Sequence, residues 1–177
     1  MAVGDLAAQP AERLRTVSSA DAPLHIVLVE PQIPPNTGNV ARLCAATGCA
    51  LHLVEPLGFS VNDRELKRAG LDYWHAVKFA MHPSLESFLH TWKTPLWLVS
   101  TRGRQPYDAA QYARGDAVVF GKETAGLPQA LLDRYVERTL RIPMRTNAVR
   151  SLNLSTAVGI VAYTALSRIG FASLELS

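Results

Sequence analysis

Short runs of apolar residues alternate along this chain with segments in which apolar residues recur every three or four positions. Residues 24–29 form a nearly continuous apolar run of strand length, which is typical of a strand buried on both faces of a parallel sheet. In the following segment Val40, Leu43 and Thr47 recur at helical spacing, and Gly48 is placed to end the helix. This alternation predicts an α/β fold with a mainly parallel sheet and helices on both of its faces.

The alternation continues toward the C-terminus and gives a predicted order of elements. Strands are expected at residues 24–29, 51–54, 77–81, 96–100, 117–120 and 139–142. Helices are expected from an N-cap at Asn36 to Gly48 and at residues 63–69, 84–92, 128–135 and 154–169. The 177 residues have the size of one domain, which we assign to residues 24–171 between tails at 1–23 and 172–177.

Composition excludes several classes of protein. An apolar share of 48% and a net charge of only +3 exclude disorder over most of the length. The first 22 residues lack the continuous apolar core of a secretion signal, and residues 151–167 are shorter and more polar than a membrane span of roughly 20 residues. Two cysteines, Cys44 and Cys49, make no disulfide framework, so we expect both to be buried thiols in a protein of the reducing cytoplasm. Because the five histidines are scattered and the cysteines are few, we expect no metal site.

Polar residues cluster in three segments next to apolar strands, where open α/β sheets bind ligands. Asn36, Asn39 and Arg42 lie three positions apart along one side of a helix start. This arrangement suits an anionic ligand, and the alternative is an N-cap with a solvent-facing arginine. In residues 120–128, two glycines on either side of a carboxylate allow the backbone to come close to a ligand.

The third segment, residues 142–155, is a basic loop that opens the last helix. From residue 138 to residue 174 there are five arginines and no acidic residue, which points to a phosphate backbone as partner. A nucleotide hydrolase is disfavoured, because residues 115–123 come nearest to a phosphate-binding P-loop but have the wrong spacing.

Taken in order, the three segments resemble the three motifs of the SpoU branch of the SPOUT (trefoil-knotted) methyltransferases. Residues 36–42 match motif 1, residues 121–128 match motif 2 and residues 142–155 match motif 3, and the likeness covers nearly the whole predicted domain. Within the branch, the stretches 30–39 and 68–73 are most similar to enzymes that methylate the ribose of the tRNA wobble nucleotide. The resemblance implies a homodimer with a C-terminal trefoil knot that binds S-adenosylmethionine, releases S-adenosylhomocysteine, acts on tRNA and uses no metal.

The resemblance also places the cofactor in the knot, bound mainly by backbone groups of three loops. The matching positions are Val99, Ser100, Gly121, Ile142 and Ser151, with Leu127 and Leu152 lining the adenine pocket. Recognition by the backbone explains why no side-chain fingerprint for a cofactor is visible in the sequence.

The implied reaction moves a methyl group from a sulfonium to a ribose 2′-hydroxyl, so the two groups must be aligned and the hydroxyl proton must leave. Arg42 matches the family's catalytic arginine. Because a guanidinium stays protonated in proteins, we expect it to anchor a phosphate and ease ionisation of the hydroxyl rather than act as a base. Asn36, Glu123, Ser151 and Asn153 match further catalytic positions. We expect Glu123 to orient Arg42 through a charge-assisted pair, within one chain or across subunits.

Contacts with RNA are expected from a separate group of residues. Arg150 and Tyr163 match positions that handle tRNA in the relatives, although a place in the core is the alternative for Tyr163. Further candidates for contact with the RNA backbone, against the alternative of a merely solvated surface, are Arg42, Arg64, Arg68, Arg102 and Arg104.

The favoured interpretation is 2′-O-methylation of cytidine or uridine 34 of tRNA. One alternative is the same chemistry at another tRNA or rRNA position. The other is a non-catalytic RNA-binding module that keeps the fold. The presence of Asn36, Arg42, Ser151 and Asn153 together favours an enzyme, because a pure binder does not need all four.

Overall fold

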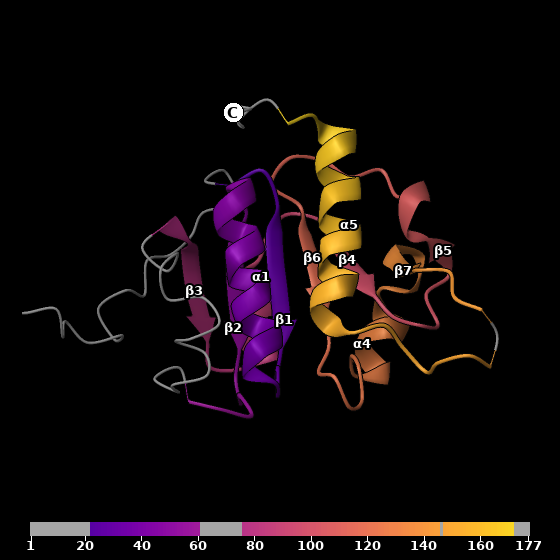
Figure 1. The fold of residues 1–177 in the computed structure, drawn as a ribbon, viewed down its shortest axis with the longest axis horizontal. Helices are drawn as coiled ribbons and strands as arrows, with labels where there is room; N and C mark the ends of the chain where they lie inside the picture. Colours follow the sequence, from indigo (N-terminus) through magenta and orange to yellow (C-terminus); the bar gives the residue numbers. More distant parts are fainter. Residues whose placement is uncertain (1–21, 61–75, 146, 172–177) are drawn as a thin grey trace, which may run out of the picture.

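The computed structural model describes residues 22–60, 76–145 and 147–171 and contains one seven-stranded sheet (Figure 1). Its strands are β1 (His25–Val29), β2 (Ala50–Val54), β3 (Lys78–His82), β4 (Leu96–Val99), β5 (Gln105–Pro106), β6 (Ala117–Phe120) and β7 (Thr139–Arg141). They lie in the order β3-β2-β1-β6-β4-β7-β5, and neighbouring strands run parallel. The predicted parallel sheet is confirmed.

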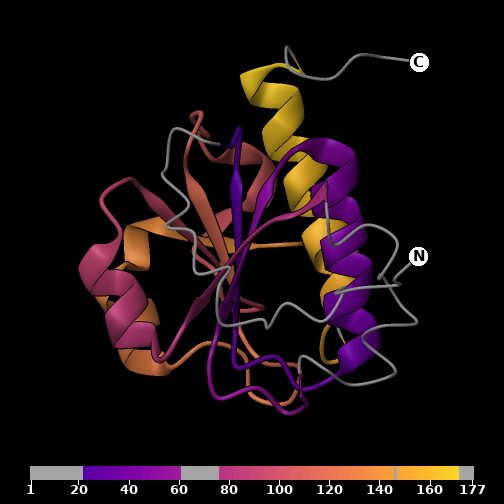
Figure 2. The same cartoon turned by 90° about the vertical axis from the view of Figure 1, so that its left-hand side faces the viewer.

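Helices cover both faces of the sheet (Figure 2). They are α1 (Pro34–Thr47), α3 (Leu85–Thr91), α4 (Gln129–Arg134) and α5 (Leu154–Ile169). α1 and α5 pack against one face, where Ile26 and Leu28 of β1 point, and α3 and α4 cover the other, where Val27 points. Because β1 is buried on both faces, its sequence is a continuous apolar run. No helix in the described ranges is long and apolar enough to cross a bilayer.

The first helix begins earlier than the sequence predicted. Its N-cap is Ile33, with proline in the first turn, so the N-cap prediction for Asn36 is wrong. Proline fits there because the first turn leaves N–H groups unbonded and the ring fixes φ near the helical value. The side chain of Asn36 is buried and contacts other loops instead of capping α1. Gly48 ends the helix in the left-handed conformation with φ 70°, as predicted.

The other predicted elements that the structure describes agree closely with it. α5 has the predicted bounds, because Asn153 caps its first N–H groups and Gly170 follows its last turn. The sequence missed β5 and two short 3₁₀ turns at Tyr107–Ala109 and Val136–Arg138, since segments of two or three residues carry no periodicity. The helix predicted at 63–69 lies outside the described residues.

The packed part of the chain begins before the predicted boundary at residue 24. Ala22 is buried, and the carbonyl oxygen of Pro23 accepts a hydrogen bond from the N–H of Gly115 at 3.0 Å. The rest of the two predicted tails lies outside the described residues.

The strand order bears on the expected knot. β4 lies between β6 and β7, although both follow it in the sequence. Insertion of two later strands on either side of an earlier one fits a C-terminal knot, which stays a prediction.

Three histidines form a row across the sheet on the face that α3 covers. His25 Nδ1 lies 2.9 Å from His52 Nε2, and His52 Nδ1 lies 2.9 Å from His82 Nε2. The rings of His25 and His52 are buried and pack edge-on against Trp92, with centroid distances of 4.7 and 5.4 Å. Each contact needs one proton between two nitrogens, so neutral rings satisfy the row.

This row predicts that the free energy of unfolding falls in acid. Burial lowers the pKa of His52 well below its ordinary value of 6.5, with repulsion from His25 and His82 as smaller causes, and burial also lowers the pKa of His82. Below about pH 6.5 the unfolded chain binds protons that the folded chain excludes. The stabilisation is therefore complete above that pH and is lost, at up to about 1.4 kcal/mol per pH unit for each such histidine, as the pH falls.

Urea unfolding between about pH 7.5 and pH 5.5 measures this slope. We expect His52→Asn to flatten it and His90→Asn, which changes an exposed histidine, to leave it unchanged. An equal slope in the wild type and both variants would contradict the prediction.

Candidate active site

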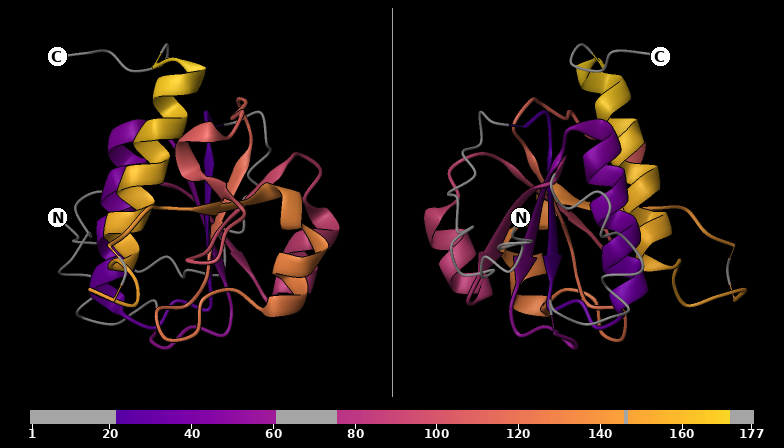
Figure 3. Two further views of the ribbon diagram at one scale, coloured as in Figure 1. Left: turned by 90° about the vertical axis from the view of Figure 1, so that its right-hand side faces the viewer. Right: turned by 60° about the vertical axis from the view of Figure 1, so that its left-hand side comes forward.

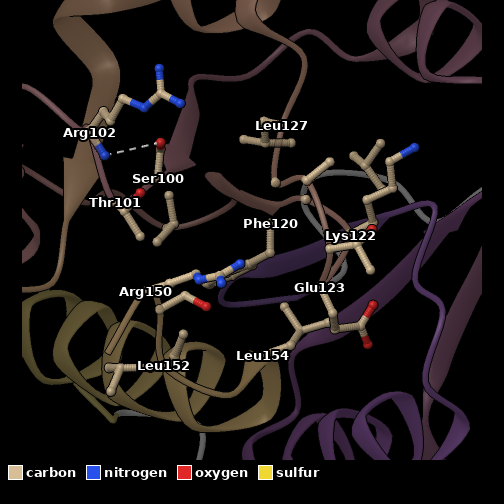
Figure 4. A pocket seen from close by; sticks show the side chains of 18 of the residues that line it. Ser100, Thr101, Arg102, Phe120, Lys122, Glu123, Leu127, Arg150, Leu152 and Leu154 are labelled. Atoms are coloured by element: carbon tan, nitrogen blue, oxygen red, sulfur yellow. Dashed lines mark hydrogen bonds between the residues drawn. The ribbon is translucent and has the colours of Figure 1, made fainter. Parts of the chain in front are cut away.

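The carboxyl ends of four neighbouring strands border one pocket. β1, β6, β4 and β7 are neighbours in the sheet, and the loops that follow them meet at one edge. Together with the start of α5 they enclose a cavity of about 940 Å³ (Figure 4). This volume lies in the range of small-molecule sites, roughly 300–1,000 Å³. The three segments that the sequence singled out therefore meet at the sheet edge where ligands bind in open parallel folds.

Most of the predicted site residues line this cavity. The seven positions predicted for cofactor binding all do so: Val99, Ser100, Gly121, Leu127, Ile142, Ser151 and Leu152. Other predicted residues in the lining are Asn36, Arg102, Glu123, Arg150 and Asn153. In Figure 4 the side chain of Arg150 extends into the cavity.

Other predicted residues lie elsewhere. Arg42 is exposed on α1 and does not line the cavity of its own chain. Tyr163 on α5 is 49% exposed, so the alternative that placed it in the core is wrong. Arg104 forms an exposed ion pair with Glu137 away from the cavity. The positions of Arg64 and Arg68 lie outside the described residues.

A hydrogen-bond network ties the three motif segments together. The Glu123 carboxylate accepts from the backbone N–H groups of Gln32 (2.9 Å) and Ile33 (3.2 Å), and from Nδ2 of Asn36 (2.9 Å). Oδ1 of Asn36 accepts in turn from Nδ2 of Asn153 at 2.9 Å. Asn153 also caps α5, so the network runs from the second motif through the first to the third.

The network shows how three of the predicted catalytic residues are held. Both amide atoms of Asn36 and both carboxylate oxygens of Glu123 bond to groups of the same chain. In Figure 4 the Glu123 carboxylate points away from Arg150. Within this chain Glu123 therefore fixes the loops around the cavity, and its pairing with Arg42 stays a prediction.

Two glycines bring backbone segments into contact at the cavity. A Cβ atom on Gly121 would lie 2.0 Å from the carbonyl carbon of Gly126 and 2.3 Å from the backbone nitrogen of Leu127. Gly126 adopts φ 69°, and its N–H donates to the carbonyl oxygen of Lys122 at 2.8 Å. The close backbone approach predicted for this segment is therefore present.

Sequence reasoning missed Glu30 and Lys122, which also line the cavity and form an ion pair with Nζ and Oε2 2.6 Å apart. Glu30 directly follows β1, and its position at a strand end was a usable signal. Lys122 lies directly before Glu123 in the second motif, and nothing local in the sequence indicates that it pairs with Glu30.

A model of the SpoU rRNA Methylase family matches residues 23–163 of the chain. The chain belongs to this family. The match spans the three motif segments and the strands that carry them, and it confirms the resemblance found in the sequence.

Individual methyltransferases are similar to most of this chain. The tRNA (cytidine(34)-2′-O)-methyltransferase of Saccharophagus degradans is 46% identical over 151 residues, which cover 84% of this chain and 97% of that protein. A solved structure from work on 2′-OH methylation of C/U34 on tRNA is 46% identical with a TM-score of 0.77, covering 82% of this chain and 89% of that one. An AdoMet-bound rRNA methyltransferase from Sinorhizobium meliloti has a TM-score of 0.77 at 25% identity, covering 89% of this chain and 60% of that one.

Proposed function

We propose that this SpoU protein transfers a methyl group from S-adenosylmethionine to the ribose 2′-oxygen of the tRNA wobble nucleotide, cytidine or uridine 34. The observation that carries the proposal is the convergence of the three motif segments on one cavity of about 940 Å³. The Saccharophagus degradans enzyme named for this reaction supports the choice of substrate, because this chain matches 97% of its length.

The cavity suits an adenosine-containing methyl donor. Leu127 and Leu152 give it apolar surface of the kind that an adenine ring packs against. Gly121 and Gly126 both line the cavity and have no side chains, so a ligand can reach the backbone there. Main-chain N–H and carbonyl groups can therefore bond the polar edge of a purine. The Sinorhizobium meliloti neighbour, which is AdoMet-bound, supports the same ligand.

When bound, the sulfonium supplies an electrophilic methyl group for in-line transfer to the ribose oxygen. Arg42 would hold the phosphate beside the target ribose and stabilise the oxygen as its proton passes to water at the open edge of the cavity. Ser151 lies exposed at the edge of the cavity, where its Oγ would accept a hydrogen bond from the 2′-hydroxyl. The network of Glu123, Asn36 and Asn153 would keep the three loops in register for this alignment.

We also propose a homodimer formed through α1 and α5, which lie side by side in both views of Figure 3. Tyr163 on α5 leaves an aromatic ring 49% exposed in the single chain, which supports a partner on this face. Arg42 lies on α1 outside the cavity of its own chain. In the dimer, Arg42 of the partner subunit would complete the site.

The tRNA would approach the exposed rim of the cavity. Arg102 and Arg150 are exposed and line the cavity, so their guanidinium groups would contact phosphates next to the target nucleotide. A tRNA substrate also agrees with the cytoplasmic location predicted from the sequence.

The network around Glu123 yields a prediction for Glu123→Gln. Three donors converge on this carboxylate, and glutamine would present an NH₂ group to at least one of them. We expect the methylation rate to fall about ten- to a hundredfold and the methyl donor to bind more weakly. Both effects follow because the second motif segment is no longer held in place against the first. Initial rates of label transfer and titration with S-adenosylhomocysteine measure the two effects.

Glu86→Gln is the control, since Glu86 is an exposed carboxylate on α3, on the opposite face of the sheet from α1 and α5. It is expected to retain the wild-type rate. Full turnover by Glu123→Gln would count against the network and also against any pairing of Glu123 with Arg42.

The function is tested by incubating the full chain with labelled S-adenosylmethionine and unmodified bulk tRNA. A 2′-O-methyl group protects the following phosphodiester from alkali, so the label should appear in an alkali-resistant dinucleotide that begins with nucleotide 34. Label at another tRNA position, or in rRNA only, would establish the alternative target. No label in any RNA would favour the non-catalytic binding module.

A further inference from the structure

An ion pair outside the matched catalytic positions joins the turn after β1 to the second motif segment at the cavity. Lys122 Nζ lies 2.6 Å from Glu30 Oε2, and the two side chains are only 33% and 32% exposed. The ion pair between Arg104 and Glu137 has side chains 61% and 72% exposed. Water screens the exposed pair more strongly, so the contact between Glu30 and Lys122 is the stronger restraint.

The backbone at Glu30 supports a functional reason for this contact. Its φ of 50° lies in the left-handed region, which residues other than glycine rarely adopt. Such a conformation persists only where the surrounding contacts fix it. The N–H of Glu30 donates to the carbonyl oxygen of Val54 at 2.9 Å, and the pair with Lys122 fixes the side chain. The turn after β1 is therefore held from both sides.

The second motif is joined to this turn by several contacts of which the ion pair is one. Glu123 accepts from the backbone of Gln32 and Ile33, and Thr124 Oγ1 donates to Gln32 Oε1 at 2.8 Å. These bonds do not involve the Lys122 side chain, so the loop stays folded when that side chain is changed. What is lost is one restraint on its position.

The restrained backbone forms part of the cavity wall. The carbonyl oxygen of Lys122 accepts a hydrogen bond from the N–H of Gly126, and this bond closes the loop of residues 122–126. The closed loop packs against the backbone of Gly121. We propose that Glu30 and Lys122 are positioning residues that hold this backbone in the place where it binds the methyl donor. The inference rests on the proposed function, and it predicts an effect on methyl-donor affinity with little effect on tRNA.

Titration of the full chain with S-adenosylhomocysteine tests the pair in a double-mutant cycle of Lys122→Met and Glu30→Gln. We expect each single variant to bind about tenfold more weakly, as for loss of one partly buried charged hydrogen bond. The double variant should bind no more weakly than the singles, because all three lack the same interaction. The KM for tRNA should stay within about twofold of the wild type. Glu137→Gln, which breaks the exposed ion pair, should bind as the wild type does.

A purely structural role would instead lower the melting temperature in step with affinity. We expect weaker binding at a melting temperature close to that of the wild type, and partial recovery of affinity when the charges are exchanged by Glu30→Lys with Lys122→Glu. Single variants that bind normally, losses that add in the double variant, or affinity that falls only as the fold is lost would overturn the inference. If the wild type itself neither binds S-adenosylhomocysteine nor methylates tRNA, the proposed function fails with it. If the wild type does both and the variants match it, only the positioning pair fails.

Discussion

An Arg42→Ala variant is expected to methylate tRNA about a hundred to a thousand times more slowly than the wild type, with unchanged affinity for the methyl donor. The rate falls because Arg42 is the group proposed to hold the phosphate beside the target ribose and to stabilise the charge that develops on the ribose oxygen. Affinity is kept because Arg42 is proposed to contact the phosphate and ribose of the tRNA and not the methyl donor, and it does not line the cavity of its own chain. Single-turnover label transfer measures the rate, and titration with S-adenosylhomocysteine measures the affinity.

Two further variants sharpen this result. Arg42→Lys should stay slow, because an ammonium lacks the planar fork with which a guanidinium holds a phosphate. Arg134→Ala removes an exposed arginine from α4 on the opposite face of the sheet and should keep the wild-type rate. Rapid transfer by Arg42→Ala, or slow transfer caused by weak donor binding, would remove Arg42 from the mechanism.

A Gly121→Ala variant is expected to bind the methyl donor at least about a hundredfold more weakly. The added Cβ would lie 2.0 Å from the carbonyl carbon of Gly126, which is backbone and cannot turn aside as a flexible side chain can. The loop must therefore shift, and the main-chain groups proposed to hold the adenosine shift with it. Calorimetric titration gives the affinity, and circular dichroism gives the melting temperature of the same samples.

The matched control for this variant is Gly159→Ala in α5. A Cβ there would meet only Cδ1 of Leu43, at 3.7 Å, which is an ordinary contact. We expect this variant to melt at or slightly above the wild-type temperature and to bind the donor normally. Normal donor binding by a folded Gly121→Ala protein would show that the cavity wall at Gly121 is not the binding surface.

Mixing the Arg42→Ala and Gly121→Ala proteins tests which subunit supplies Arg42 to each cavity. If Arg42 of the partner subunit completes each cavity, a mixed dimer of Arg42→Ala and Gly121→Ala chains has one complete site. Random reassociation should then restore roughly a quarter of the wild-type rate, since half of the dimers are mixed and each has one working site. If each chain uses its own arginine, the mixture stays inactive.

Much of the fold could be predicted because the elements have strong local patterns. β1 and β6 are buried along their whole length, and such strands appear in the sequence as apolar runs. α5 has an amphipathic period, a capping asparagine and a glycine at its end, so its bounds were predicted correctly. The start of α1 was wrong because Asn36 is a good capping residue, and nothing local shows that its amide is needed elsewhere.

The site was predictable where a motif carried it and not where it depends on contacts between distant residues. Glu30 and Lys122 are 92 positions apart, and neither has a neighbour in sequence that indicates the other. The bond between Asn36 and Asn153 spans 117 positions. Such contacts follow from the strand order, which places β1 beside β6, and local patterns do not fix that order.

A crystal structure of the full chain with S-adenosylhomocysteine tests the central claim most directly. The account predicts the adenine ring between Leu127 and Leu152, bonded by backbone groups of the loops that follow β4, β6 and β7. An adenosine bound at any other surface, with this cavity empty, would contradict it.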